Sequence, residues 1–281
     1  MSLPEYAVLM SVYYKEKPEF FRAAAESMTA QTHKPSQFVL VCDGPLTPEL
    51  EGEIYRLEAG HPGLVDVVRL KENRGLAEAL NEGLRYVRYD FIARMDSDDI
   101  SLPERCETQL KYMLRHKADI CSATVAEFEN DPEVITTLKT LPKNHAQIME
   151  YARTRNPFNH PCVMYRKQAV LKAGKYENYR YFEDYQLWVK MLTNGAKSYN
   201  VQKPLLKMRT GGGMFARRGG RAYLRYARQM ERYKLKAGFC SKAEYMKRMS
   251  AFTVFSLAPV SVREKLYKSL LRKKGDQKDG H

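Results

Sequence analysis

Three carboxylates fall within four residues of this sequence, directly after a short apolar run over residues 91–95. They are Asp96, Asp98 and Asp99, with Ser97 between the first two. Side chains alternate in an extended chain, so we expect Asp96 and Asp98 to share one side and Asp99 to point away. With nothing basic directly beside them, two such carboxylates repel each other unless a cation lies between them. Hard oxygen ligands favour Mg²⁺ or Mn²⁺, and an ion held by few protein groups usually also binds phosphates.

The same acidic stretch also has a structural interpretation. Asp99 would be the N-cap of the following helix, with Pro103 in its first turn. We favour that interpretation for Asp99 and the metal-site interpretation for the pair Asp96 and Asp98. The expected place of the pair supports a ligand site, because ligands in open α/β sheets bind beyond the carboxyl ends of the strands.

The elements around the cluster alternate between strand and helix. Buried strands are expected over residues 7–12, 37–43, 64–70 and 91–95. Helices are expected from Pro18, after Thr47 as N-cap, over 76–87 and over 103–116. Short connections between them predict right-handed βαβ units and a parallel, doubly wound sheet. Beyond these, the pattern predicts strands over 119–129, 161–165 and 201–208, and helices over 145–153 and from residue 183.

The charge of the chain is concentrated at its C-terminal end. The net charge is +14, and residues 203–281 hold 21 Lys and Arg against 5 Asp and Glu. The rest of the chain is therefore close to neutral. Such asymmetry suggests an anionic partner, either nucleic acid or an anionic membrane surface.

The cysteines and the longest apolar run set further limits. Five cysteines are scattered without a CxxC pair, and we see no signal peptide ahead of them. This argues for reduced thiols in a cytosolic compartment and against a zinc site. The run over residues 251–260 is too short to cross a bilayer.

Two further acidic positions stand at element ends. Asp43 follows a strand and precedes a Gly-Pro turn, on the edge expected for Asp96; it could accept a hydrogen bond from a nucleotide base, although Asp before Gly is also common turn chemistry. Asp184 lies in the first turn of a helix, where the helix dipole favours its charged form. On spacing alone, Glu183 and Asp184 are explained as ordinary charge complementarity at a helix N-terminus.

Taken together, these motifs resemble the family 2 glycosyltransferases, which are inverting enzymes of the GT-A fold. The motifs are residues 10–13, 42–44, 73–81, 96–99 and 183–184, and the resemblance covers roughly Tyr6 to Arg221. The amino-acid sequences of residues 93–101, 156–161 and 217–220 are most similar to the amylovoran and capsular-polysaccharide branch of the family.

The resemblance implies an α/β fold with a Rossmann-like, mostly parallel sheet flanked by helices, and a basic helical C-terminal extension. The catalytic domain would cover residues 1–209, with a nucleotide-binding half at about 1–100 and an acceptor half at about 101–209. The basic helical region would be residues 210–281.

The resemblance also implies roles for single residues on the donor side. Asp96 and Asp98 would form the DXD motif, with Asp98 on a Mn²⁺ or Mg²⁺ ion and Asp96 on the ribose or the metal shell. Asp43 would read the base, with Ser11 and Tyr13 beside it on the first strand. Arg74 would contact the nucleotide, and Cys42 stands where many members have a second Asp.

Asp184 matches the catalytic base of the family. A carboxylate that takes the proton of a sugar hydroxyl in the transition state contributes on the order of 10²–10⁴-fold. One base and one metal on opposite sides of the anomeric carbon give displacement with inversion, without a second carboxylate as nucleophile.

Several other residues are candidates for acceptor or phosphate contacts. His160 lines the acceptor side or is structural, and Arg209 before three glycines belongs to a loop over phosphates or to a plain connector. Arg217 and Arg218 would meet the diphosphate of a lipid acceptor or simply solvate a helix start. Glu183 is the second choice as base.

We therefore expect a metal-dependent inverting glycosyltransferase that uses a nucleotide sugar, with UDP-sugars favoured. The acceptor would be a surface-polysaccharide saccharide, lipid-linked through polyprenyl diphosphate, at the cytoplasmic face of the plasma membrane. Residues 251–274 would bind its anionic surface as a peripheral anchor, with a basic helix packed on the catalytic body as the alternative. A sugar nucleotidyltransferase is the competing class of enzyme; a nucleic-acid-binding protein is less expected, because no recognisable reader motif is present.

Overall fold

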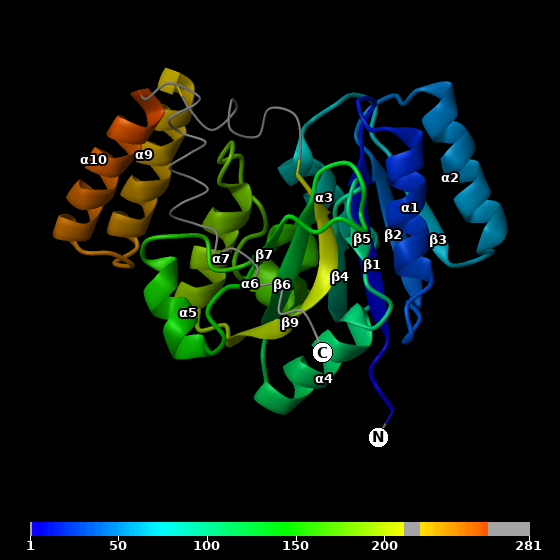
Figure 1. Ribbon diagram of the computed structural model, residues 1–281, viewed down its shortest axis with the longest axis horizontal. Helices are drawn as coiled ribbons and strands as arrows, with labels where there is room; N and C mark the ends of the chain where they lie inside the picture. Colours follow the sequence, from blue (N-terminus) through cyan, green and yellow to red (C-terminus); the bar gives the residue numbers. More distant parts are fainter. Residues whose placement is uncertain (1, 211–219, 258–281) are drawn as a thin grey trace.

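The computed structural model describes residues 2–210 and 220–257, and Figure 1 shows a curved sheet with helices packed on both faces. The strands are β1 (Tyr6–Val12), β2 (Gln37–Cys42), β3 (Val65–Arg69), β4 (Phe91–Met95), β5 (Ile100–Ser101), β6 (Ile120–Phe128), β7 (Thr137–Lys139), β8 (Met164–Arg166) and β9 (Ser198–Arg209). The helices are α1 (Pro18–Thr29), α2 (Pro48–Gly60), α3 (Leu76–Tyr86), α4 (Arg105–His116), α5 (His145–Ala152), α6 (Lys167–Lys172), α7 (Glu183–Thr193), α9 (Gly220–Lys236) and α10 (Lys242–Leu257), with a 3₁₀ turn η1 (His160–Cys162).

The sheet has the order β3-β2-β1-β4-β8-β6-β9-β5, and β7 pairs with β6 at its side. The pairs β3–β2, β2–β1, β1–β4 and β6–β9 are parallel and long, whereas each antiparallel pair joins only two or three residues. The expected α/β architecture with a mostly parallel sheet is confirmed. The four strands expected to form parallel βαβ units pair in parallel in the order β3-β2-β1-β4, and β8 then runs antiparallel to both β4 and β6.

Alternate residues of the fully buried strands enter two cores on opposite faces of the sheet. On β1, Leu9 faces the core that contains α3 and α7, whereas Val8 and Met10 face the core of α1, α2 and α4. Helix α3 lies very close to the sheet at Gly83, where an added Cβ would be 2.5 Å from Leu9 Cδ1. The absence of a Cβ at Gly83 therefore allows α3 to seat this closely on β1 and β2.

Most of the expected elements are present, and the differences are local. Thr47 caps α2, and its Oγ1 accepts a hydrogen bond from Leu50 N at 3.3 Å. Asp99 is not an N-cap: two residues of β5 follow it, and α4 begins at Arg105 after Glu104. The strand expected over 161–165 begins only at Met164 because η1 precedes it, and the pattern did not predict β5, β7 or α6.

Helices α9 and α10 lie side by side at one end of the molecule, next to α5 and α7 (Figure 1). A buried ion pair joins Lys234 to Glu231 at 2.8 Å, and Lys234 Nζ also donates to Arg153 O and Tyr185 Oη. No helix in the described ranges is long and apolar enough to cross a membrane.

The remaining C-terminal expectations cannot be placed. Arg217, Arg218 and residues 258–274 of the expected anchor lie outside the described residues, and the division at residue 209 stays a prediction.

Candidate active site

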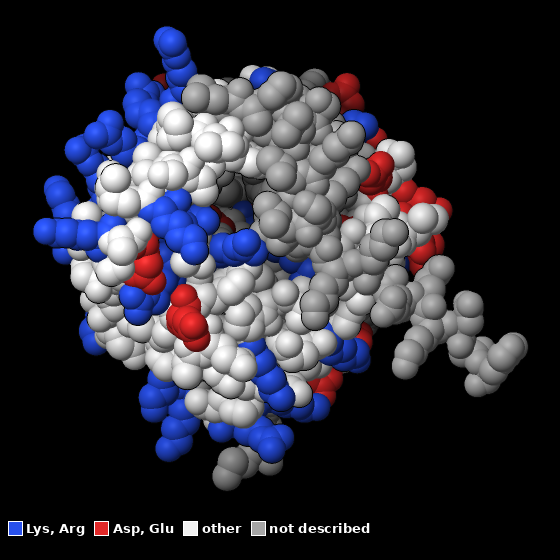
Figure 2. Space-filling model, turned by 60° about the vertical axis from the view of Figure 1, so that its left-hand side comes forward, with Lys and Arg blue, Asp and Glu red and all other residues white. Residues whose placement is uncertain are grey.

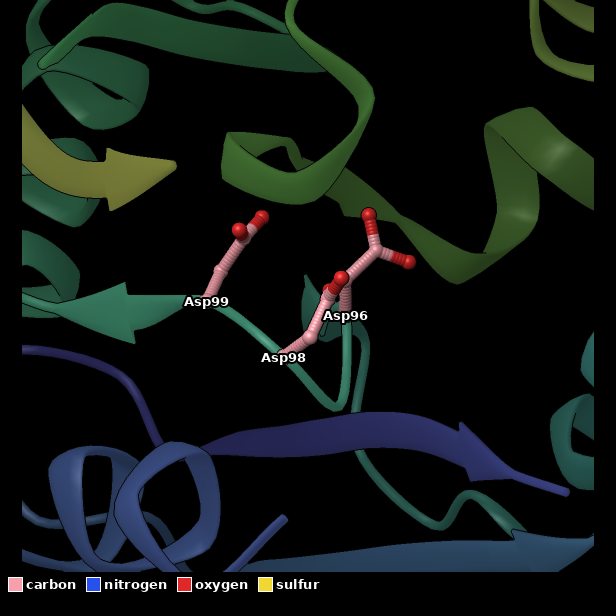
Figure 3. A group of neighbouring side chains, drawn as sticks. All are labelled: Asp96, Asp98 and Asp99. Carbon is pink, nitrogen blue, oxygen red and sulfur yellow. The ribbon is translucent and has the colours of Figure 1, made fainter. Parts of the chain in front are cut away.

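The three aspartates of the acidic stretch converge at the carboxyl end of β4. Oxygen atoms of Asp96, Asp98 and Asp99 all lie within 4.8 Å of one another (Figure 3). The expectation that Asp99 points away is wrong, because the chain turns at Ser97 and Asp98 instead of staying extended. The turn adds a third carboxylate to the pair that the sequence predicted.

Arg94, two residues before the cluster, is a buried cation that the sequence analysis missed. Its side chain is 1% exposed and forms an ion pair with Asp96. The expectation that nothing basic lies beside the carboxylates is therefore wrong. Nε and Nη1 of Arg94 are buried without a hydrogen-bond partner in the described part of the chain. An arginine within an otherwise apolar strand was the signal that could have revealed it.

The cluster still carries more negative charge than Arg94 balances. Burial, together with repulsion from Asp96 and Glu16, raises the pKa of Asp98 to about 7. Burial and the two neighbouring aspartates also raise the pKa of Asp99 well above its usual range. Several convergent carboxylate oxygens that disfavour one another's ionisation are the donor set that Mg²⁺ and Mn²⁺ prefer. The residues present therefore fit a divalent cation.

Arg209, the last residue of β9, is tied to the acidic loop. Its backbone N–H donates to Asp99 Oδ1 at 2.7 Å, and its Nε donates to Asp98 O at 3.1 Å. Its guanidinium lies over the rings of Phe20, at 3.6 Å from the centroid, and Phe128. These contacts fix Arg209 at the rim of the cluster.

Asp43 organises the loop before α3. It is 4% exposed, and its two carboxylate oxygens accept the backbone N–H groups of Arg74 and Gly75 at 2.7 and 2.9 Å. Gly75 has φ +86°, a conformation that glycine adopts without strain. Each carboxylate oxygen keeps a second lone pair, so Asp43 can still accept a hydrogen bond from a ligand. The Arg74 side chain is half-exposed and 3.8 Å from Glu78.

The end of β1 lies next to β2 and β4 at the same edge of the sheet. Ser11 is half-buried on β1, opposite Val41, and Tyr13 follows the strand with 40% of its side chain exposed. Ser97 Oγ donates to Glu16 Oε2 at 2.5 Å, which links the acidic loop to the loop after β1. Glu16 was not predicted as part of the site, and an exposed-looking Lys-Glu-Lys sequence gave no signal for it.

Asp184 is the second residue of α7 and is held at both oxygens. Asn156 Nδ2 donates to Oδ2 at 2.6 Å, and Tyr185 N donates to Oδ1 at 2.7 Å. Burial raises the pKa of Asp184, while these two hydrogen bonds and Arg94 oppose the increase. Burial also raises the pKa of the adjacent Glu183 to about 7. A fixed carboxylate of raised basicity has the properties of a general base.

His160 lies among aromatic residues. Its Nε2 is 3.1 Å from Tyr176 Oη, and its ring lies 5.9 Å from that of the buried Trp188. Burial, with a contribution from Arg94, holds the pKa of His160 well below its usual range. The contacts favour the structural interpretation of His160, because its ring is enclosed by Tyr176 and Trp188.

Residues 8–174 match the family described as Glycosyl transferase family 2. The chain belongs to this family. The amylovoran biosynthesis glycosyltransferase AmsE of Erwinia amylovora is 39% identical over 93% of this chain and 97% of that relative. A galactosyltransferase of Escherichia coli, UDP-Gal:alpha-D-GlcNAc-diphosphoundecaprenol beta-1,3-galactosyltransferase, is 33% identical over 96% of this chain and 98% of its own length.

Solved structures agree with the fold of this family 2 glycosyltransferase. TarS 1-349 of S. aureus with UDP-GlcNAc has a TM-score of 0.67 at 15% identity, and covers 95% of this chain and 76% of that one. The mannosyltransferase PcManGT of Pyrobaculum calidifontis with GDP-Man and Mn²⁺ has a TM-score of 0.65 at 15% identity, over 96% and 76%. The expected family and GT-A-type fold are confirmed, and the named relatives are glycosyltransferases rather than nucleotidyltransferases.

Proposed function

We propose that this glycosyltransferase moves a sugar, with inversion, from a nucleotide donor bound with Mn²⁺ or Mg²⁺ to a saccharide acceptor. The observation that carries the proposal is the pairing of two acidic sites of different character. One is a cluster of three carboxylates at the end of β4, and the other is the single fixed carboxylate of Asp184. Arg94 acts electrostatically on both.

The donor would bind at the strand ends around Asp43 and the acidic cluster. Asp98, with Asp96, would hold the metal, which when bound stabilises negative charge on a diphosphate leaving group. Asp43 would hydrogen-bond the base, and Ser11, Tyr13 and Arg74 lie at the same edge. UDP-sugars are favoured because the relative of known donor from E. coli is named for UDP-Gal.

Asp184 would accept the proton of the attacking hydroxyl. The hydrogen bonds from Asn156 and Tyr185 N orient the carboxylate and leave lone pairs free for the acceptor. Its raised pKa strengthens it as a base.

The acceptor would be a growing surface polysaccharide, carried on polyprenyl diphosphate. The names of the two relatives support this, since one acts in amylovoran biosynthesis and the other on a diphosphoundecaprenol-linked sugar. Such an acceptor is membrane-bound, so the enzyme would work as a peripheral protein at the cytoplasmic face of the plasma membrane.

Calorimetry with UDP tests the donor site. Binding should be clear with Mn²⁺ and much weaker with EDTA or in Asp98→Ala, whereas Glu5→Ala removes an exposed carboxylate elsewhere and should bind normally. Equal affinity in all samples would contradict the metal site. Asp43→Ala should also weaken UDP and relax the preference over other nucleoside diphosphates. A hydrolysis screen of nucleotide sugars then identifies the donor.

A further inference from the structure

One exposed face of α9 carries a line of four cations, Arg225, Arg228, Arg232 and Lys236. Their spacing of three, four and four residues places them on one side of a helix with 3.6 residues per turn. Figure 2 brings the α9–α10 side forward and shows Lys and Arg side chains gathered along the left of the view. We call these four residues the α9 stripe.

The α9 stripe has no acidic partner in residues 2–210 and 220–257. None of the ion pairs of those residues includes any of its four cations. The one acidic residue of α9, Glu231, is buried and paired with Lys234. Glu177, which acts electrostatically on Tyr179 and Tyr233, is paired with Lys190 at 2.6 Å. Like charges three or four residues apart repel, so the stripe is unfavourable until an anion meets it.

The cations line a groove of about 400 Å³ together with two tyrosines. The rings of Tyr179 and Tyr233 meet edge-to-face with their centroids 5.8 Å apart. Tyrosine has an apolar ring and a polar hydroxyl, which suits the boundary between lipid headgroups and water. The groove therefore combines positive charge with the side chains typical of a membrane interface.

The length of the α9 stripe favours a surface over a single small ligand. From Arg225 to Lys236 the helix rises about 16 Å at 1.5 Å per residue. This exceeds the span of one diphosphate and matches a row of neighbouring headgroups. We propose that the α9 stripe docks the protein on an anionic lipid bilayer.

Docking through α9 would place the bilayer beside the catalytic helix. The ring of Tyr223 on α9 lies 5.5 Å from those of both Tyr181 and Phe182, and Asp184 follows two residues later. A lipid-linked acceptor would explain why the base should face a membrane. Only this part of the inference rests on the proposed function.

Vesicle co-sedimentation of the full chain tests the docking surface. Each basic residue near an anionic surface strengthens binding roughly fivefold, so Arg228→Glu with Arg232→Glu should weaken binding to phosphatidylglycerol vesicles by about 25-fold or more. The matched control, Lys34→Glu with Lys71→Glu, changes the net charge equally on exposed residues near β2 and β3, and should bind within about threefold of wild type. Neutral phosphatidylcholine vesicles and high salt should abolish binding.

Three results would overturn the docking surface. They are wild-type binding by the stripe variant, an equal loss in both charge variants, and tight calorimetric binding of inorganic pyrophosphate without vesicle binding. The last would assign a diphosphate site instead.

The pair Arg228→Gln and Arg232→Gln repeats the test without charge reversal, and thermal unfolding confirms that each variant is folded. Hydrolysis of the nucleotide sugar separates the two proposals: the stripe variant should retain it, whereas a wild-type chain that sediments without any hydrolysis would refute the transferase proposal alone.

Discussion

Arg94 and Lys234 are both buried cations, yet their surroundings differ. Lys234 faces one carboxylate, that of Glu231, and its other donors reach two oxygen acceptors. Arg94 is paired with Asp96, keeps two nitrogens without a partner among the described residues, and lies near further carboxylates. Buried groups left unpaired lower stability and occur mainly where function requires them. Lys234 thus has a described partner for each of its three donors, whereas two nitrogens of Arg94 at the catalytic edge have none.

The largest expected effect is a loss of turnover, and it tests the catalytic side of this comparison. Asp184→Asn keeps the size of the side chain but removes its basicity, so kcat should fall by about 10²-fold or more. UDP affinity should stay within a small factor, because the proposed donor site lies at the strand ends. Steady-state kinetics and calorimetry measure the two quantities.

The neighbouring carboxylate supplies the control for Asp184. Glu183→Gln should retain most of the turnover, since Asn156 orients Asp184 and not Glu183. If Glu183→Gln loses more activity than Asp184→Asn, then Glu183 takes the proton.

Breaking the balanced pair should destabilise the protein. Lys234→Met leaves Glu231, which is 1% exposed, without its main partner, and such a change costs about 3–5 kcal/mol of unfolding free energy. Because Arg248 Nε lies 3.8 Å from Glu231 and remains as a second cation, the loss of unfolding free energy should be toward the lower end of this range. Lys234→Met with Glu231→Leu should recover most of the loss. Urea unfolding measures both, and a single variant within about 1 kcal/mol of wild type would contradict the assignment.

Removing Arg94 should change the pH dependence of catalysis. Burial raises the pKa of Asp184, and Arg94 is one of the groups that hold it down. The base must be ionised, so kcat falls as the pH drops through its pKa. Arg94→Met should move this acidic limb to higher pH, and Arg94→Lys should restore it toward wild type because the charge remains. An equal loss of activity at every pH would mean that Arg94 is only structural.

The smallest effect concerns an exposed ion pair between α5 and α10. Hydrogen bonds from Arg153 and Ser241 N lower the pKa of Glu244 from 4.5 to about 2. Its charged form therefore stabilises the fold above about pH 4.5, and this contribution is lost as the pH falls toward 2. Glu244→Gln should remove about 1 kcal/mol near neutral pH and flatten the acid dependence of unfolding. Glu150→Gln, an exposed carboxylate of α5, should leave both unchanged.

The sequence predicted the fold correctly where a residue pattern is compatible with only one type of secondary structure. Continuous apolar runs gave the buried strands, and Thr47 before Pro48 gave a helix start that the structure confirms. The short antiparallel additions could not be predicted, because two or three residues of β5 or β7 carry no periodicity and form only against a partner strand.

The site was predictable where residues of one chemical type cluster in the chain. Asp96 and Asp98 were found in this way, but the turn that brings in Asp99 was not. Asn156 and Glu16 reach the site from distant loops through hydrogen bonds to Asp184 and Ser97, and only the folded chain brings them together. Sequence alone shows which residues can do chemistry, and tertiary contacts decide which of them meet.

The single tryptophan of the chain gives this protein a built-in optical reporter. Trp188 is buried on α7, one helical turn from Asp184, with the rings of Phe158, His160, Tyr165 and Tyr176 around it. All tryptophan emission therefore originates from one known place behind the proposed base. A rearrangement of this aromatic group on acceptor binding would be visible in the fluorescence of the unlabelled protein.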